Sequence, residues 1–291
     1  MSVPPWTAAA QVFSTPWYID TACIDCGAAC HVAPDLIIER NGKSVFARQP
    51  ATPQEVLAAW RAAYVCPTAS VRTETKQPRP KAVVFPQELT DGVWRCGFNA
   101  RDSFGAHSYF IRRAGGNLLV DAPRHAGELV KWFESAGGIA HILLSHRDDV
   151  ADANKYAERF HARVWIHHDD RSAAPFATDI IEGPAAVAIV DEVVAIPVPG
   201  HTEGSVAYLF DERVLFTGDT LAWSRHDDDV TAFRDACWFS WTALADSLEK
   251  LARYRFEWLL PGHGWPVSLP AAEMSARLRA LVARMRKGNV V

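Results

Sequence analysis

The sequence predicts an α/β protein in two parts, a small cysteine-bearing α+β domain and a large domain in which strands and helices alternate. Two observations support this division. Four of the six cysteines lie in the first 66 residues, and segments of strand length alternate with amphipathic helical segments in the rest. Between these parts, three prolines and mixed charges break any periodic pattern in TETKQPRPKAVVFPQEL. We place the boundary near residue 78, which gives domains 1–77 and 78–291.

The small domain is predicted to contain strands, a hairpin and a helix. The segments DLIIER and SVFARQ flank Asn41-Gly42, a dipeptide that accepts the positive φ values of a two-residue hairpin turn. A helix is expected to begin at Thr52, because Pro53 suits its first turn and Glu55 completes a capping box. It should end just before Cys66-Pro67.

In the large domain, segments with the hydrophobic periodicity of a helix alternate with segments of strand length. HAGELVKWFESAGG predicts an amphipathic helix closed by Gly137, and the following HILL predicts a buried strand. The remaining strands and helices are expected at VWIHHDD, AYLF, VLFTG, TALADSLEKLARY and AAEMSARLRALVARM.

Composition excludes several functional classes. Hydrophobic residues make up 49% of the 291 residues and charged residues 22%, which is enough to build one large core and one small domain. No apolar stretch has the length of a membrane span. The net charge is -4, without a basic cluster interleaved with aromatic residues, so nucleic-acid binding is not expected. The first residues lack the basic start and apolar core of a secretory signal, and we expect a cytoplasmic protein.

Three glycine-bearing turns predict a metal site. The segments PVPGHTEGSVAYLF, LFTGDTL and LLPGHGW place His201, Asp219 and His263 at strand ends. Imidazole and carboxylate are donors that suit zinc, iron or manganese, and a carboxylate between two cations can bridge them. A metal-dependent enzyme is therefore the leading hypothesis.

These turns resemble the PGHT-x-GS, GD and GHG motifs of the metallo-β-lactamase superfamily. The resemblance covers about residues 82–291, including FGAHSYFI and NLLVDAP, which are similar to its opening strands. It implies an αβ/βα sandwich and, most often, hydrolysis: a metal-held water attacks a carbonyl or ester while the metal stabilises the oxyanion. Asp121 in NLLVDAP is then a candidate to support a ligating histidine.

The first motif of that family, H-x-H-x-D-H, is only partly present. In SHRDDVADANKYAERF, His146 matches, whereas Asp148 stands where the second histidine is expected. Val150 and Ala151 replace the expected aspartate and final histidine. A carboxylate remains a competent ligand, so the resemblance implies a first metal site at His146, Asp148 and His201, with Asp219 as bridge and His263 as the remnant of a second site.

Two further aspartates are candidates for orienting the water or acting as base, namely Asp149 and Asp152. Asp148 and Asp152 would share one face of a helix that begins near Asp149. The alternative is that these carboxylates only cap and charge a helix N-terminus.

The N-terminal cysteines predict a second metal group. CIDCGAAC followed by a distant Cys-Pro supplies Cys23, Cys26, Cys30 and Cys66, and resembles the cluster motif of bacterial ferredoxins. Ala29 occupies the usual third ligand position, so a 4Fe-4S or a 3Fe-4S iron-sulfur cluster is expected, with Cys30 as a ligand only if the loop bulges. A zinc knuckle or two disulfides are the alternatives.

Together these features predict a metal-dependent hydrolase that uses one or two zinc or iron ions on a small-molecule ester, thioester or lactone. Two alternatives remain. One is a non-haem iron oxidoreductase of the persulfide dioxygenase or flavodiiron kind, which would need a redox partner. The other is a binding protein with a degenerate site. The loop LAWSRHDDDVTAFRDACWFSW is either a substrate wall or a solvated surface loop.

Overall fold

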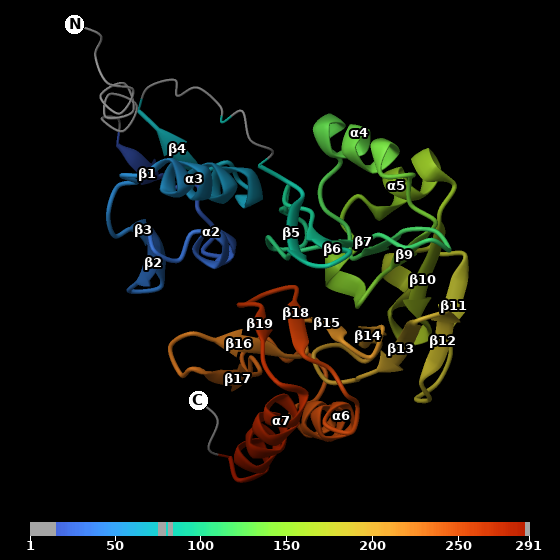
Figure 1. Ribbon diagram of the computed structural model, residues 1–291. Helices are drawn as coiled ribbons and strands as arrows, with labels where there is room; N and C mark the ends of the chain where they lie inside the picture. The colour runs from blue at the N-terminus through green and yellow to red at the C-terminus, as the bar shows by residue number, and fades with distance from the viewer. Residues whose placement is uncertain (1–15, 75–79, 81–83, 289–291) are drawn as a thin grey trace, which may run out of the picture.

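The computed structural model describes residues 16–74, 80 and 84–288, and Figure 1 shows how they are arranged. In the N-terminal part, β1 pairs with β4 and β2 pairs with β3, both antiparallel. The elements of this part are β1 (Trp17–Ile19), α2 (Ala28–Val32), β2 (Ile37–Arg40), β3 (Lys43–Phe46), α3 (Pro53–Val65) and β4 (Val71–Thr73).

The local predictions for this part are confirmed. Asn41 and Gly42 have φ values of 54° and 69° and join β2 to β3 in the expected two-residue turn. Thr52 caps α3 in a full capping box with Glu55, and the helix ends directly before Cys66. The predicted domain boundary near residue 78 lies outside the described residues.

The larger part contains a mixed sheet of seven strands in the order β11-β10-β9-β8-β7-β6-β5. The pairs from β8 to β11 are parallel and the pairs from β5 to β8 are antiparallel. Its strands are β5 (Gln87–Thr90), β6 (Val93–Arg95), β7 (Tyr109–Ile111), β8 (Leu118–Val120), β9 (His141–Leu143), β10 (Arg163–His167) and β11 (Asp179–Ile181).

A second sheet has six strands in the order β12-β13-β14-β15-β18-β19. Its one parallel pair among the described residues is β15 with β18. Its strands are β12 (Val187–Val190), β13 (Val193–Pro197), β14 (Val206–Phe210), β15 (Val214–Gly218), β18 (Trp258–Pro261) and β19 (Val267–Ser268), and β16 (Ala222–Ser224) and β17 (Asp229–Thr231) form a separate hairpin.

Helices cover the outer face of each sheet, as Figure 1 shows. One core lies between the two sheets, a second between the first sheet and α4 and α5, and a third between the second sheet and α6 and α7. The αβ/βα sandwich predicted from the sequence is therefore confirmed. The helices are α4 (Gly127–Ser135), α5 (Ala153–Phe160), α6 (Trp241–Leu251) and α7 (Ala271–Arg286), with 3-10 turns η1 (Arg147–Asp149) and η2 (His168–Ala173). Among the described residues, none of the helices has the length and apolar character needed to cross a membrane.

Strand direction brings the predicted ligands to one edge of the sandwich. His146 follows β9, and Asp219 follows β15. Strands β15 and β18 are parallel neighbours, so His263, just after β18, emerges beside Asp219. Strand β13 runs in the same direction as β15, because β14 is antiparallel to both, and His201 therefore emerges at the same edge.

Candidate metal centre

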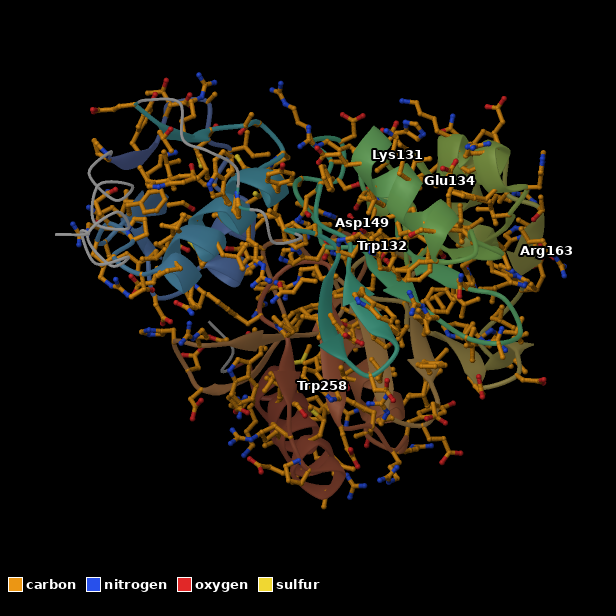
Figure 2. The ribbon with its side chains drawn as sticks, turned by 45° about the horizontal axis from the view of Figure 1, so that its top comes forward. Lys131, Trp132, Glu134, Asp149, Arg163 and Trp258 are labelled. Atoms are coloured by element: carbon orange, nitrogen blue, oxygen red, sulfur yellow. The ribbon has the colours of Figure 1, made fainter. Side chains whose placement is uncertain are left out.

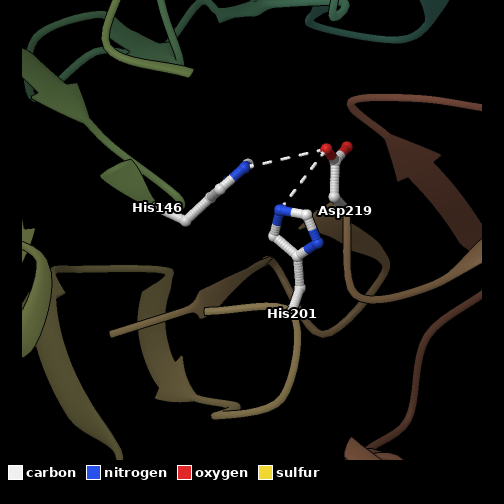
Figure 3. A group of neighbouring side chains, drawn as sticks. All are labelled: His146, His201 and Asp219. Carbon is white, nitrogen blue, oxygen red and sulfur yellow. Dashed lines mark ion pairs between the residues drawn. The ribbon is translucent and has the colours of Figure 1, made fainter. Parts of the chain in front are cut away.

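Three of the predicted ligands converge on one point. One ligand atom from each of His146, His201 and Asp219 can be chosen so that all three lie within 4.8 Å of one another. Figure 3 shows the two imidazole rings approaching the carboxylate from different strands, with the dashed lines of 3.7 Å and 3.8 Å meeting at Asp219 Oδ2. The rings are nearly perpendicular, with centroids 4.7 Å apart.

Asp148 provides a fourth donor. Its Oδ2 lies 3.3 Å from His201 Nε2 and 3.9 Å from His146 Nε2. The neighbouring His201 ring lowers the pKa of Asp148, so this carboxylate is ionised near neutral pH. Asp148 stands at the position of the second histidine in the H-x-H-x-D-H motif, and its carboxylate oxygen lies among the other candidate ligands.

The donor set fits a divalent cation. Both Nε2 atoms are buried, and neither has a hydrogen-bond partner within the described part of the chain. Burial lowers the pKa of His146 to about 4, so its ring is neutral near pH 7 and its lone pair is free to coordinate. Unpaired buried nitrogens are costly, and a cation among two imidazoles and two carboxylates would satisfy them.

His146 is held by a short chain of contacts behind it. Its Nδ1 lies 2.9 Å from Ser145 Oγ, and the Ser145 backbone N–H donates to Asp121 Oδ1 at 2.7 Å. A Cβ at Gly218 would lie 2.5 Å from Ser145 Oγ, so only glycine lets β15 approach this closely. Asp121 therefore supports the ligand loop through Ser145 and does not contact the histidine directly.

Asp149 lies beside the cluster and is buried. Its side chain is labelled in Figure 2, in the interior of the molecule. Its Oδ2 lies 4.0 Å from His146 Nδ1, and neither carboxyl oxygen has a hydrogen-bond partner among the described residues. Burial and the nearby Asp219 and Asp121 raise the pKa of Asp149 well above its usual value. It is a carboxyl group that can hold a proton next to the ligands.

Asp152 is not brought to this cluster. Its Oδ2 accepts the backbone N–H of His125 at 2.6 Å, and its Oδ1 pairs with Lys155 at 2.7 Å. Asp148 lies in the 3-10 turn η1, whereas α5 begins only at Ala153, so the expectation of one shared helical face was wrong. Asp152 occupies the N-cap position of α5, but its side chain makes no capping hydrogen bond.

His263 contacts Asp219 and does not belong to the group of converging ligand atoms. Its Nδ1 lies 2.8 Å and 2.9 Å from the two Asp219 oxygens, and its Nε2 lies 3.2 Å from the Phe104 carbonyl oxygen. Burial alone would lower the pKa of His263, but Asp219 outweighs it, so the pKa is raised. With both nitrogens engaged, His263 holds Asp219 in place.

The cysteine segment forms a separate cavity in the N-terminal part. Cys23, Cys26 and Cys66 line it, together with the methyl group of Ala29. The backbone N–H of Ser70 donates to Cys66 Sγ at 3.1 Å. Burial raises the pKa of Cys26 to about 11, so a bound cation would be needed to hold it as a thiolate. Three thiols that face one cavity fit an iron-sulfur cluster.

Cys30, which was predicted to be a ligand only if the loop bulges, lies outside this lining. Its Sγ contacts Ser44 Oγ at 3.6 Å, and Ala29 takes the position that faces the cavity. The loop does not bulge, because α2 begins at Ala28, directly after Gly27. All six cysteines are free thiols, Cys96 and Cys237 included.

Residues 91–285 match the family model described as the metallo-beta-lactamase superfamily. The chain belongs to the metallo-β-lactamase superfamily. In addition, residues 19–73 match the model of the 4Fe-4S single cluster domain of ferredoxin I. Both resemblances inferred from the sequence motifs are thus confirmed.

Similar proteins include two that are named hydroxyacylglutathione hydrolase. The one from Acidiphilium cryptum is 32% identical over 119 residues, which is 40% of this chain and 49% of that protein. The one from Bradyrhizobium sp. (strain BTAi1) is 34% identical over 128 residues, 41% of this chain and 48% of that protein. The chain spans about half the length of these relatives.

Solved structures with the same fold include two metallo-β-lactamases. The enzyme from Hirschia baltica aligns with a TM-score of 0.53 at 16% identity, over 67% of this chain and 96% of that one. FIM-1 from Pseudomonas aeruginosa, in a mono-zinc form, aligns with a TM-score of 0.54 at 15% identity, over 70% and 95%. At these identities the likeness concerns the fold.

Two positions at which the superfamily motif has an aspartate and a histidine carry apolar residues in this chain. Val150 is buried, and Ala151 has a methyl group where a histidine is expected. Asp219 and Asp149 both face Gly262, at which a Cβ would lie 2.9 Å and 2.8 Å from their oxygens. The geometry gathers four donors at one centre. Val150 and Ala151 add no ligand atom to it.

The sequence reasoning missed Asp170, which joins two ligand loops. This fully buried carboxylate accepts the Arg147 backbone N–H at 3.0 Å and the Thr202 hydroxyl at 2.6 Å through one oxygen. Arg147 follows His146 and Thr202 follows His201, so Asp170 fixes the separation of the two imidazoles. The signal was an acidic residue just beyond the strand in VWIHHDD, where β10 ends at His167.

Two exposed aromatic side chains flank the centre. The Trp238 ring is 6.2 Å from that of His201 and 61% exposed, and the Phe104 ring is 6.0 Å from that of His263 and 52% exposed. The backbone N–H of Trp238 also donates to the His201 carbonyl at 2.9 Å. The loop that carries Trp238 therefore lies against the centre.

Proposed function

We propose that the protein is a metal-dependent hydrolase that cleaves a thioester and holds one divalent ion at His146, Asp148, His201 and Asp219. The observation that carries this proposal is the convergence of two carboxylates and two buried imidazoles whose Nε2 atoms have no hydrogen-bond partner among the described residues. Similarity to proteins named as hydrolases of a glutathione thioester supports the substrate class.

The ion, when bound, would supply Lewis acidity, which lowers the pKa of water and polarises a carbonyl group. The protein's own contribution to proton transfer falls to Asp149. Its buried carboxyl group lies beside the ligands and has no hydrogen-bond partner among the described residues, so it is placed to accept a proton and return it. Asp152 is not proposed for this role, because its carboxylate is engaged with His125 and Lys155.

In the proposed reaction, water adds to the thioester carbonyl carbon and the carbon–sulfur bond breaks, which yields a carboxylic acid and a thiol. Asp149 takes the proton from water and returns it to the departing sulfur. Trp238 and Phe104 offer apolar surface on either side for the small-molecule substrate.

For the second group, we propose an iron-sulfur cluster that would be held by Cys23, Cys26 and Cys66, beside Ala29, which offers no ligand atom. Such a cluster is either a 3Fe-4S species or a 4Fe-4S species with a labile fourth iron. Purified without oxygen, the protein should be brown and contain acid-labile sulfide, and Cys66→Ala should lose the colour while Cys96→Ala retains it. A colourless zinc protein after anaerobic reconstitution would contradict this assignment. A compartment that keeps thiols reduced, such as the cytoplasm, suits this site.

The hydrolase proposal is tested by thiol release from a panel of thioesters, oxyesters and lactones, with zinc- or iron-loaded protein. His201→Ala should lose both metal and activity, because it removes one of four ligands. Asp149→Asn should keep the metal and lose most of the activity. Asp152→Asn is the matched control and should retain both. Equal thiol release by His201→Ala and the parent would reject the proposal.

One observation favours a second candidate. Two imidazoles with a carboxylate form the ligand type of non-haem iron oxygenases, and Asp148 gives this chain a carboxylate where the superfamily motif has histidine. A non-haem iron dioxygenase of this kind would consume oxygen with a persulfide substrate only when iron is bound, and the substrate itself would supply the electrons. The same panel, extended to persulfides in an oxygen electrode, separates the two candidates, and inactivity on every substrate at full metal occupancy would favour a binding protein.

A further inference from the structure

A backbone contact links the cysteine cavity to the metal centre. Gly105 lies directly on Cys26: a Cβ at this glycine would be 2.6 Å from the Cys26 sulfur, and its φ of 84° is one that side chains rarely adopt. The preceding residue, Phe104, accepts a hydrogen bond from His263 Nε2 at 3.2 Å through its carbonyl oxygen. His263 Nδ1 in turn bonds Asp219. The Cys26 sulfur and Asp219 are thus connected through the Phe104–Gly105 loop and the His263 imidazole.

A second set of contacts reaches the same turn. The His31 ring lies over Gly27, where a Cβ would be 3.0 Å from its Nε2, and its Nδ1 lies 3.2 Å from His107 Nε2. The backbone N–H of His107 donates to the Gly262 carbonyl oxygen at 2.8 Å. The loop that carries Cys26 therefore meets the Gly262–His263 turn by two routes.

This turn also supports Asp219 through the backbone. The His263 backbone N–H donates to Asp219 Oδ1 at 3.1 Å, in addition to the side-chain bonds. The Gly262 N–H donates to the Gly218 carbonyl at 2.8 Å, directly before Asp219. A change of charge or position at Cys26 therefore acts on a residue whose hydrogen bonds set the orientation and electron density of Asp219, and such effects are strong in a buried, low-dielectric region.

We propose that the Gly262–His263 turn couples the cysteine cavity to the metal centre, so that metal affinity depends on the redox state of the cluster. This inference rests on the two cofactor sites of the proposed function and not on the reaction catalysed. Reduction adds one negative charge on the cluster side, which strengthens the hold on a cation at the other end. By linkage, metal binding must make the cluster easier to reduce by the same factor.

The test compares the midpoint potential of the cluster in the intact protein with and without Zn²⁺, by redox titration followed by electron paramagnetic resonance. Zinc is redox-silent, so a shift reports coupling between the sites. We expect Zn²⁺ to bind about tenfold more tightly to the reduced form, within the usual range for coupled sites, which equals a rise of ~59 mV for a one-electron couple.

Two variants separate the assigned path from simple attraction through space. His263→Phe keeps an aromatic ring but removes both ring nitrogens, and should abolish most of the shift. Phe104→Ala removes the exposed ring but keeps the carbonyl oxygen, and should retain the shift. An equal shift in all three proteins, or no shift in the parent with both groups bound, overturns the coupling. Failure of the protein to bind either a cluster or Zn²⁺ overturns the cofactor proposal itself and the coupling with it.

Discussion

Replacing Asp170 with alanine tests how the two imidazoles are held apart. The side chain is fully buried, and one oxygen accepts hydrogen bonds from the Arg147 backbone and from Thr202. Thr202 keeps a partner in Ser205 Oγ at 2.8 Å, whereas the Arg147 N–H is left without this acceptor. Hydrogen bonds to a charged group contribute about 1.5–3 kcal/mol each, so we expect the free energy of unfolding to fall by roughly 2–4 kcal/mol.

The same change should weaken metal binding, although Asp170 is not among the proposed ligands. Residues that orient ligands from behind typically change metal affinity by about 10–100-fold. Denaturant unfolding of the metal-free protein and competition for Zn²⁺ against a chromophoric chelator measure the two effects separately. Asp169→Ala is the matched control, because the adjacent carboxylate pairs with His167 away from the ligands. Unchanged Zn²⁺ affinity in Asp170→Ala would refute the reasoning.

Three further predictions follow from the geometry. Asp149→Asn should lower the rate of thiol release by at least ~100-fold, the usual scale for a general base, with Zn²⁺ content unchanged; a parallel loss of Zn²⁺ would make Asp149 a ligand instead. Ala29→Cys adds a fourth thiol to the cavity lining, and should raise the iron-to-sulfide ratio and slow the loss of iron in air, with Cys30→Ala as the neutral control. Burial holds the pKa of His107 well below that of an unfolded histidine, so the unfolded chain binds the extra proton as pH falls below about 6.5. His107 alone then contributes a loss of up to ~1.4 kcal/mol of stability per pH unit there. His107→Gln should lose less over the same range in denaturant titrations, and identical slopes would contradict the assignment.

The features predicted correctly from the sequence depend on local rules or on strand direction. The capping box at Thr52 and the turn at Asn41-Gly42 involve neighbouring residues. The meeting of His201 with Asp219 follows because residues that leave strands running in the same direction emerge at one edge, and the glycine directly before each of these residues marks the turn.

The errors concern the direction in which individual side chains point. Successive helical residues are rotated by about 100°, so once α2 begins at Ala28 only one of Ala29 and Cys30 can face the cavity. Which one does so depends on the position of Gly27, which no spacing rule reveals. Asp170 was missed for a related reason, since its two donors come from loops that meet only in the folded protein.

The replacement of a motif histidine by Asp148 changes the charge balance of the proposed metal centre. His146 and His201 are proposed as neutral ligands, while Asp148 and Asp219 contribute two negative charges, so a divalent ion would be neutralised by its own ligands. A site with three histidines and fewer carboxylates leaves more positive charge on the ion and acidifies its water more strongly. With Asp148 in place of a histidine, the ion would acidify its water less, and a side chain of the protein would have to remove the proton. Asp149, buried beside the ligands, is the group positioned to remove it.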